Sequence, residues 1–215
     1  MSLFKKIITI ILDFKTTRRL LSFRFAGYLV DTGWFNAYTT KSSVGKENQP
    51  IPWVTYSFIE FITPRLNKEL EMFEYGSGNS TLFYADRVGK VDTVENNRDW
   101  YEKVREDMPQ NVEMLFRELV PGGDYCRAAK ELGRKYDIII VDGRDRVNCV
   151  RNSCPCLKEG GVLVLDDSER DQYKDAFDVM YKEGFRNIGF WGVGVGLFYN
   201  KCTTIFYKEK NCLGI

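Results

Sequence analysis

The segment Met72–Thr81 reads MFEYGSGNST and is the strongest single indication of the fold. A short, mostly apolar stretch delivers an acidic residue, Glu74, and two glycines, Gly76 and Gly78, follow it. Glycine permits a tight turn and the close approach of a ligand, and Ser80 or the threonine after it can begin a helix. The order is typical of a strand, a ligand-binding turn and a helix.

Short apolar runs and helix-like stretches alternate through the rest of the chain. Five apolar runs (71–75, 90–95, 112–116, 136–141, 161–165) each precede a helix-like stretch (80–88, 98–108, 124–132, 146–157, 171–183). Parallel strands need crossover connections, so this order predicts a mainly parallel sheet with helices on both faces. Two final runs, 186–191 and 203–208, are joined by a glycine-rich stretch without helical pattern and predict an antiparallel hairpin. We therefore expect an α/β fold, a Rossmann-like, doubly wound, mainly parallel seven-stranded sheet with a C-terminal antiparallel hairpin and an N-terminal helical arm.

The first 30 residues are basic and amphipathic. They carry a net charge of +5, against −4 for the rest of the chain. Apolar residues recur at helical spacing between Leu3 and Phe14, but the unbroken apolar run is far too short to span a bilayer. Such a helix packs on its own domain or on a second subunit more often than it lies on an anionic membrane surface. All three arrangements, including a homodimer and peripheral contact with the inner face of the membrane, stay open here.

Periodicity is lost over residues 28–52, and residues 41–52 are rich in Ser, Gly, Asn and Pro, as in a surface loop. A helix is expected next, over 54–66. We therefore divide the chain into an N-terminal amphipathic arm and lid, residues 1–52, and a cofactor-binding domain, residues 53–215.

Composition excludes several classes of protein. With 44% hydrophobic residues, the 215-residue chain can fill a core without disulfides or metal. The net charge of +1 disfavours nucleic acid as a partner. The absence of histidine removes Ser-His-Asp catalysis and histidine-ligated zinc. The six cysteines lack paired Cys-x-x-Cys units and follow no cleavable export signal, so we expect reduced thiols and a cytoplasmic protein.

A second acidic residue supports nucleoside binding. The next apolar run ends in Glu95, 21 residues after Glu74, and at this spacing a carboxylate can accept hydrogen bonds from both ribose hydroxyls. Nicotinamide dinucleotides and S-adenosylmethionine then remain as cofactors. The dinucleotide fingerprint has no role for Glu74, whereas S-adenosylmethionine has an amino group that this acid can hold. Glu74 therefore favours S-adenosylmethionine.

In four motifs the sequence resembles the class I S-adenosylmethionine-dependent methyltransferase superfamily. The segment 74–78 (EYGSG) is similar to its first motif, and Glu95 to its ribose-binding acid. The segment 136–143 (YDIIIVDG) is similar to the motif that closes its fourth strand, and 160–167 (GGVLVLDD) to its fifth strand. The resemblance covers residue 53 to the C-terminus and implies methyl transfer from S-adenosylmethionine.

A closer resemblance is to small bacterial methyltransferase-like proteins with a Pro-Trp-x-x-Tyr element, here residues 52–56 (PWVTY). These proteins share the segments 142–146 (DGRDR) and 166–170 (DDSER), and an IFY strand near an NCLGI end. The resemblance identifies a cofactor and a reaction class, but no acceptor.

Asp142 is the leading candidate for a catalytic base, because it ends the fourth strand beside the expected cofactor crevice. An equally good interpretation is that Asp142 caps a turn or pairs with Arg144 or Arg146. With Asp166 and Asp167 it resembles the divalent-metal site of catechol O-methyltransferases. The third position is Asp rather than Asn and the expected lysine is missing, so a divalent metal, although chemically feasible, is not favoured.

We expect cofactor contacts from the turn, from the ends of the strands and from three aromatic residues. Trp53 and Tyr56 would cover the methionine end, and Tyr125 would border adenine. The full predicted set is Trp53, Tyr56, Glu74, Gly76, Ser77, Gly78, Asn79, Ser80, Glu95, Asn96, Tyr125 and Asp142.

The sequence thus predicts a methyltransferase that acts on an oxygen of a small-molecule or glycan-like acceptor. A non-catalytic module that binds S-adenosylmethionine, or docks to a membrane or partner, is the alternative from another class. A nicotinamide oxidoreductase is a further alternative.

Overall fold

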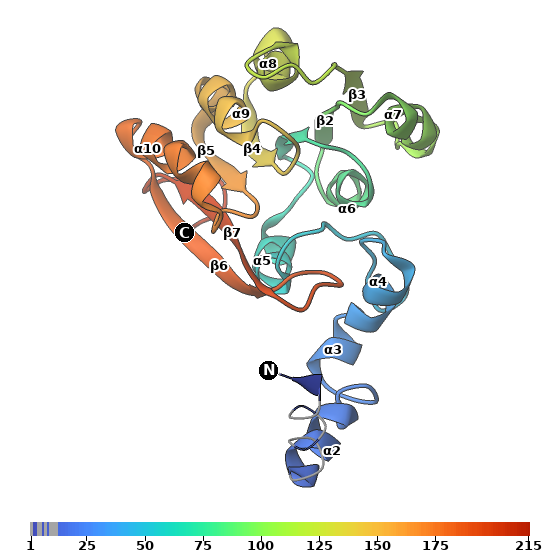
Figure 1. The fold of residues 1–215 in the computed structure, drawn as a ribbon. Helices are drawn as coiled ribbons and strands as arrows, with labels where there is room; N and C mark the ends of the chain where they lie inside the picture. The colour runs from blue at the N-terminus through green and yellow to red at the C-terminus, as the bar shows by residue number, and fades with distance from the viewer. Residues whose placement is uncertain (1, 4–5, 7, 9–12) are drawn as a thin grey trace.

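The computed structural model describes residues 2–3, 6, 8 and 13–215 (Figure 1). Among these residues, seven strands form one sheet in the order β3-β2-β1-β4-β5-β7-β6. The strands are β1 (Glu71–Tyr75), β2 (Lys90–Glu95), β3 (Val112–Phe116), β4 (Tyr136–Val141), β5 (Leu157–Leu165), β6 (Arg186–Val193) and β7 (Asn200–Tyr207). Neighbouring strands from β3 to β5 are parallel, and β7 pairs antiparallel with both β5 and β6. The predicted sheet and C-terminal hairpin are confirmed.

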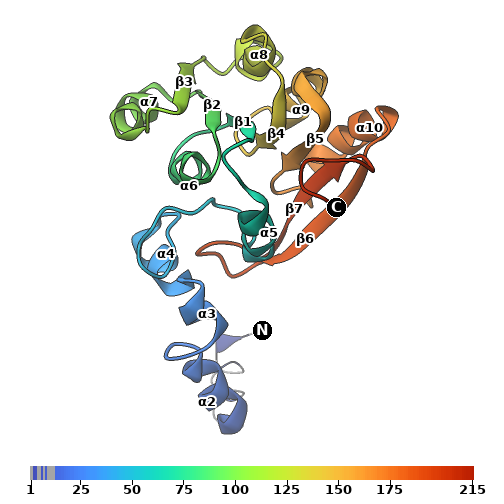
Figure 2. The same cartoon turned by 180° about the vertical axis from the view of Figure 1, so that it is seen from behind.

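Helices cover both faces of the sheet (Figures 1 and 2). One face carries α8 (Asp124–Glu131), α9 (Arg146–Ser153) and α10 (Lys174–Lys182); the other carries α5 (Tyr56–Ile62) and α6 (Asn79–Arg87). The short α7 (Arg98–Val104) follows β2. Short 3-10 turns, η1 (Thr63–Arg65), η2 (Arg105–Asp107), η3 (Cys154–Cys156) and η4 (Asp171–Tyr173), complete the connections.

The two cores follow from the alternation of side chains along each strand. In β4, Ile139 and Val141 pack into the cluster beneath α8–α10, whereas Ile138 and Ile140 pack beneath α5 and α6. Because both faces are buried, the central strands are nearly continuous runs of apolar residues. These runs made the strands recognisable in the sequence.

The chain order changes direction at the centre of the sheet, between β1 and β4. In doubly wound folds the crevice at the carboxyl ends of such strands is the usual ligand site. Glu74, Gly76 and Asp142 lie at or just beyond these strand ends. The fold therefore brings together residues that are far apart in the sequence.

Part of the predicted arm is folded against the domain. Instead of an aperiodic stretch, residues 28–40 contain α3 (Tyr28–Asp31) and α4 (Trp34–Thr40). Ala37 and Ile51 are buried in the core beneath α5 and α6. These helices are too short for sequence periodicity to show them, because a single buried position such as Ala37 makes no repeat.

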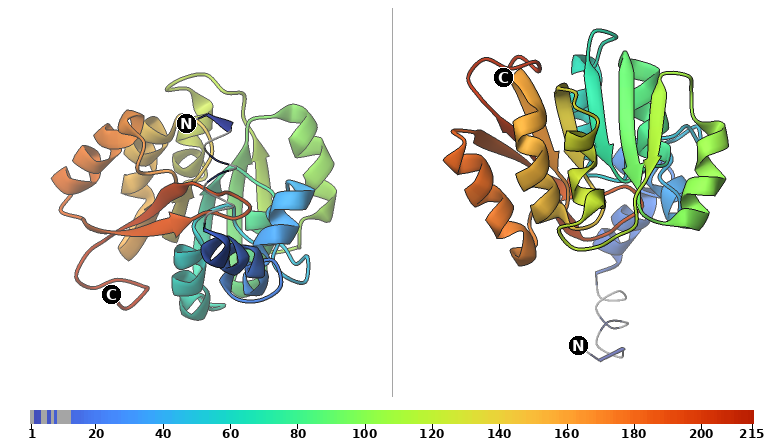
Figure 3. Two further views of the ribbon diagram at one scale, coloured as in Figure 1. Left: turned by 60° about the horizontal axis from the view of Figure 1, so that its bottom comes forward. Right: turned by 90° about the horizontal axis from the view of Figure 1, so that it is seen from above.

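The helix α2 (Phe14–Ser22) lies at the far end of the arm, away from the sheet, as Figures 1 and 2 show. It contains no buried residue. The right-hand view in Figure 3 shows the strands side by side between the two layers of helices. In the part of the chain that the structure describes, no helix is long and apolar enough to cross a bilayer. The prediction of a packed amphipathic helix before Asp13 concerns residues that mostly lie outside the described part of the chain.

Candidate functional site

The turn after β1 forms one wall of the site. Gly76 and Gly78 have φ angles of 94° and 152°, values that glycine adopts readily. The Thr81 hydroxyl accepts a hydrogen bond from the Gly78 N–H (3.1 Å) and donates one to Oε2 of Glu74 (2.5 Å). The first turn of α6 therefore holds both the glycine turn and the acidic side chain.

Glu74 is a buried acid with an unusual pKa. Its side chain is almost fully buried, and it makes no ion pair with any described residue. Burial raises its pKa from 4.5 to about 7, although hydrogen bonds from Ser80 and Thr81 act in the opposite direction. The carboxyl group is thus poised to bind a cationic ligand group, which would favour its ionised form.

We expect the substitution Glu74→Gln to stabilise the ligand-free protein at pH 8 by up to about 3 kcal/mol. The folded-state pKa lies above the ordinary value, so the folded protein loses stability as the pH rises from about 4.5 to 7. Glutamine has no proton to lose and can still accept the Thr81 hydrogen bond. Urea unfolding at pH 5 and pH 8 measures the effect.

The matched control is Glu69→Gln, which changes an exposed glutamate just before β1. We expect it to leave the difference between the two pH values unchanged. A Glu74→Gln protein with the same pH dependence as the parent would contradict the assigned pKa.

Glu95 lies at the end of β2 with its carboxylate held in place. Its Oε1 atom accepts hydrogen bonds from the N–H groups of Asn96 (2.8 Å) and Asn97 (2.7 Å). The Ser77 hydroxyl donates to Oε2 (3.2 Å), and the Trp100 ring nitrogen donates to the Ser77 carbonyl (2.8 Å). The side chain has one oxygen fixed by the backbone and the other directed at the glycine turn.

These residues line one cavity of about 500 Å³. From the predicted set, the lining includes Trp53, Glu74, Gly76, Ser77, Gly78, Asn79, Ser80, Glu95, Asn96 and Asp142. Residues that the sequence patterns did not assign to the cofactor also line it, among them Lys41, Ser42, Ser43, Trp100, Arg144 and Arg170. The volume is in the range of small-molecule and cofactor sites.

Two predicted residues, Tyr56 and Tyr125, lie outside this lining. Tyr125 is fully buried on α8, where its ring packs edge-on against Tyr75 and its hydroxyl accepts from the Arg144 N–H (3.4 Å). Tyr56 is buried beside Tyr28, with ring centroids 6.0 Å apart. Both rings therefore pack in the core behind the pocket wall.

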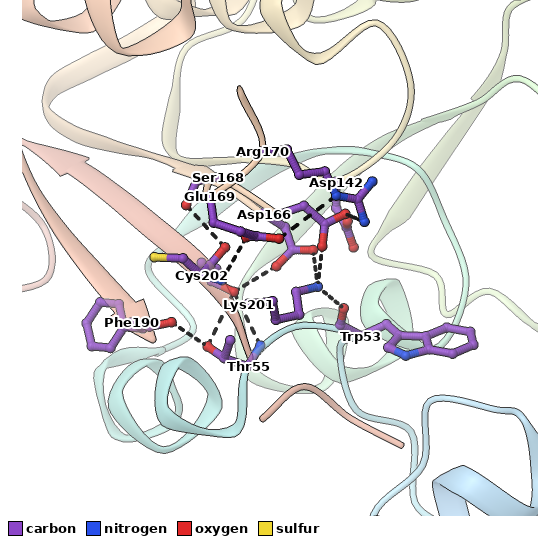
Figure 4. A network of polar contacts seen from close by, with 12 residues as sticks. Trp53, Thr55, Asp142, Asp166, Ser168, Glu169, Arg170, Phe190, Lys201 and Cys202 are labelled. Carbon is purple, nitrogen blue, oxygen red and sulfur yellow. Dashed lines mark hydrogen bonds and ion pairs between the residues drawn. The ribbon is translucent and has the colours of Figure 1, made fainter. Parts of the chain in front are cut away.

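Three carboxylates meet at the ends of β4 and β5, as expected, and three cations contact them. Arg170, which Figure 4 shows beside the cluster, contacts Oδ2 of Asp167 (2.7 Å). Arg146, from α9, contacts Oδ1 of Asp142 (3.0 Å) and Oδ2 of Asp167 (3.3 Å). Lys201, from β7, contacts Oδ2 of Asp166 (2.6 Å) and Oδ1 of Asp167 (2.8 Å). The interpretation of Asp142 as an ion-pair partner is therefore confirmed for Arg146.

Lys201 is the residue that sequence analysis missed. Its ammonium group is almost fully buried and also donates to the carbonyl of Trp53 (3.4 Å), which lines the pocket. Thr203, two residues along β7, donates to Oδ1 of Asp166 (2.7 Å). A lysine and a threonine at alternate positions share one face of a strand, and this inward polar face was the available signal.

The pKa values of the residues in this cluster shift in different directions. Burial, and next the charge of Asp166, raise the pKa of Asp142 well above its ordinary value. Burial lowers the pKa of Lys201, but the nearby carboxylates outweigh it and raise that pKa to about 12. Burial acts to raise the pKa of Asp167, but Lys201, Arg146 and Arg170 together outweigh it and lower that pKa. In Asp142 burial and the neighbouring acid thus favour the neutral form, whereas in Asp167 the surrounding cations favour the ionised form.

The arrangement does not suit a divalent metal. Within the described residues, no group of three or more His, Cys, Asp or Glu side chains could hold a metal ion. The oxygens of Asp142 and Asp167 that such an ion would need are already in contact with Arg146, and Lys201 contacts Asp166. Three side-chain cations, Arg146, Arg170 and Lys201, thus supply the charge that neutralises this acidic cluster.

A segment from the predicted lid reaches the pocket. The side-chain amide of Asn79 donates to the Ser43 carbonyl (2.8 Å) and to the Ser42 hydroxyl (3.4 Å). Lys41, just after α4, lines the same cavity. The loop that follows α4 is therefore fastened directly to the first residue of α6.

The similarity of this chain to known proteins is found in its structure and not in its sequence. No family model matches the sequence, and no curated protein matches it significantly. A precorrin-6y C5,15-methyltransferase from Geobacter metallireducens superposes with a TM-score of 0.54 at 13% identity, covering 80% of this chain and 96% of that one. A methyltransferase-like protein from Silicibacter pomeroyi gives 0.53 at 22% identity, covering 74% and 89%.

A candidate methyltransferase from Streptococcus mutans, solved in complex with S-adenosylhomocysteine, gives a TM-score of 0.51 at 15% identity and covers 69% of this chain and 94% of that one. These likenesses agree with the strand order and with the pocket at the carboxyl ends of β1, β2 and β4. The chain therefore has the Rossmann-like fold of the class I S-adenosylmethionine-dependent methyltransferases.

Proposed function

We propose that this protein is an S-adenosylmethionine-dependent methyltransferase that acts on an oxygen of a small-molecule or glycan-like acceptor. The observation that carries the proposal is the single cavity lined by Glu74, the glycine turn and Glu95. Glu74 is a buried acid that lacks a cationic partner among the described residues, and the amino group of the cofactor is such a partner. Glu95 would accept hydrogen bonds from the ribose hydroxyls.

S-adenosylmethionine supplies an electrophilic methyl group on a sulfonium. The pocket's main task is to align the acceptor oxygen with that methyl group, because alignment provides much of the acceleration of an in-line displacement. As the oxygen–carbon bond forms and the carbon–sulfur bond breaks, a hydroxyl acceptor must lose its proton. Asp142, a pocket residue with a raised pKa, would take that proton.

The test is calorimetric titration of the purified protein with S-adenosylhomocysteine, NAD and NADP. We expect binding of S-adenosylhomocysteine alone. Glu95→Ala should weaken it by about 1 to 3 kcal/mol, because hydrogen bonds to a charged acceptor are lost.

Glu118→Ala is the matched control, since Glu118 is exposed and does not line the pocket. Unchanged affinity in a folded Glu95→Ala protein would refute the ribose assignment. Preferential binding of NAD or NADP would favour the oxidoreductase alternative. Binding of S-adenosylhomocysteine without turnover of S-adenosylmethionine on a panel of hydroxylated acceptors would favour the binding module.

A further inference from the structure

The helix α2 presents a large apolar surface that its own domain does not cover. Phe14, Leu20 and Leu21 are exposed by 69%, 61% and 64% of their surface. Phe23 and Phe25, just after the helix, are also exposed. In Figures 1 and 2 the helix lies at the far end of the arm, away from the sheet. Packing on its own domain, the first of the three arrangements considered for this segment, does not occur for α2.

The two sides of α2 differ in charge. At 100° per residue, Phe14, Leu20 and Leu21 fall on one side, and Lys15, Arg18 and Arg19 fall on the other. No acidic residue lies within the helix. None of the three cations makes an ion pair with a described residue. The helix is therefore an amphipathic surface with an uncompensated charge of +3.

The positive charge of α2 distinguishes between the two remaining partners, a second copy of the chain and an anionic membrane. In a symmetric dimer the apolar side of each copy would face its counterpart, and the cations on the other side of each helix would be left in solvent without a partner. An anionic bilayer matches both sides, because the apolar side chains enter the boundary of the acyl chains and the cations meet the phosphates of the headgroups.

We propose that α2 docks the protein on the surface of an anionic phospholipid bilayer, parallel to the membrane plane. The proposal does not depend on methyl transfer.

The experiment is co-sedimentation of the full-length protein with phosphatidylcholine vesicles, with and without phosphatidylglycerol. We expect binding only to the anionic vesicles, and weaker binding as salt is added. The triple variant Lys15→Glu/Arg18→Glu/Arg19→Glu and the double variant Leu20→Ser/Leu21→Ser should each lower the partition coefficient by at least about tenfold.

A matched control carries the same charge change elsewhere, as Lys130→Glu/Lys182→Glu/Arg186→Glu. These residues are exposed on α8, α10 and β6, away from the arm (Figure 1). We expect this variant to bind within about twofold of the parent. An equal loss in the control would show unspecific attraction and overturn the proposal, as would a parent protein that does not bind.

The oligomeric state provides the second readout. Sedimentation velocity in the absence of lipid should show the same species for the parent and for Leu20→Ser/Leu21→Ser. A parent dimer that dissociates in the double variant would assign the apolar side of α2 to a second copy and overturn the proposal. Circular dichroism checks that each variant is folded.

Discussion

Gly76→Val is expected to leave a folded protein that no longer binds S-adenosylhomocysteine, with an affinity loss of at least about a hundredfold. The Gly76 φ angle of 94° is unfavourable for a β-branched residue. A Cβ atom there would also lie 3.4 Å from the Cα atom of Gly143, in the loop that follows the neighbouring strand β4. The added methyl groups would therefore displace the turn or occupy the space of the ligand. Calorimetry measures the affinity, and circular dichroism measures the fold.

Two alanine variants distinguish the effect of backbone strain from the effect of blocking the space of the ligand. Gly76→Ala and Gly133→Ala both place a side chain on a backbone with positive φ, but the space around Gly133 is open. Both should lose about 1 kcal/mol of stability from backbone strain, whereas only Gly76→Ala should weaken binding. Tight binding by a folded Gly76→Val protein would contradict the placement of the ligand against this turn.

Lys201→Met is expected to destabilise the protein by about 3 to 5 kcal/mol at pH 8, the cost of removing a buried cation from two buried carboxylates. Asp166 and Asp167 lie 2.6 and 2.8 Å from the ammonium group. Interaction with Lys201 lowers the pKa of Asp167, and the stability from this interaction is present above the ordinary carboxyl pKa and is lost at lower pH. The defect should therefore shrink only as the pH falls below about 3.8, the ordinary pKa of the carboxyl group. Urea unfolding across this range measures it.

A second variant keeps this prediction open to refutation if Lys201→Met does not fold. In Lys201→Met/Asp166→Asn one negative charge is removed together with the positive one, so the double variant should recover at least half of the lost stability. Lys174→Met is the control, because Lys174 forms an exposed pair with Asp171 and should contribute little. A Lys201→Met protein as stable as the parent would show that the cluster does not need this cation.

The sheet was predictable because its central strands are buried on both sides. The run 136–141 can be identified as a strand from its own residues alone, since every residue but one is apolar or aromatic. Strand ends were less certain. β5 begins at Leu157, four residues before the predicted start, because Gly160 adopts a φ angle of 76° and the strand continues through it with a shift in register.

The glycine turn after β1 was predictable because its residues are contiguous in the sequence. The rest of the cavity lining was not predictable, because it depends on which side chains the fold directs into the cavity. Tyr125 and Tyr56 have suitable chemistry and suitable positions in the sequence, but both pack in the core. Lys201 is far from the acids in the sequence, and only the antiparallel pairing of β7 with β5 brings it to them.

The position of Lys201 has a consequence for the order in which the protein can mature. During synthesis the ribosome releases Asp142, Asp166 and Asp167 well before β7, so the nascent chain holds three neighbouring acids with Arg146 and Arg170 but without Lys201. The strand that carries Lys201 must insert beside β5 before this end of the sheet can close. Completion of the ligand-binding crevice is thereby coupled to translation of the final hairpin, and a chain released early would lack a finished site.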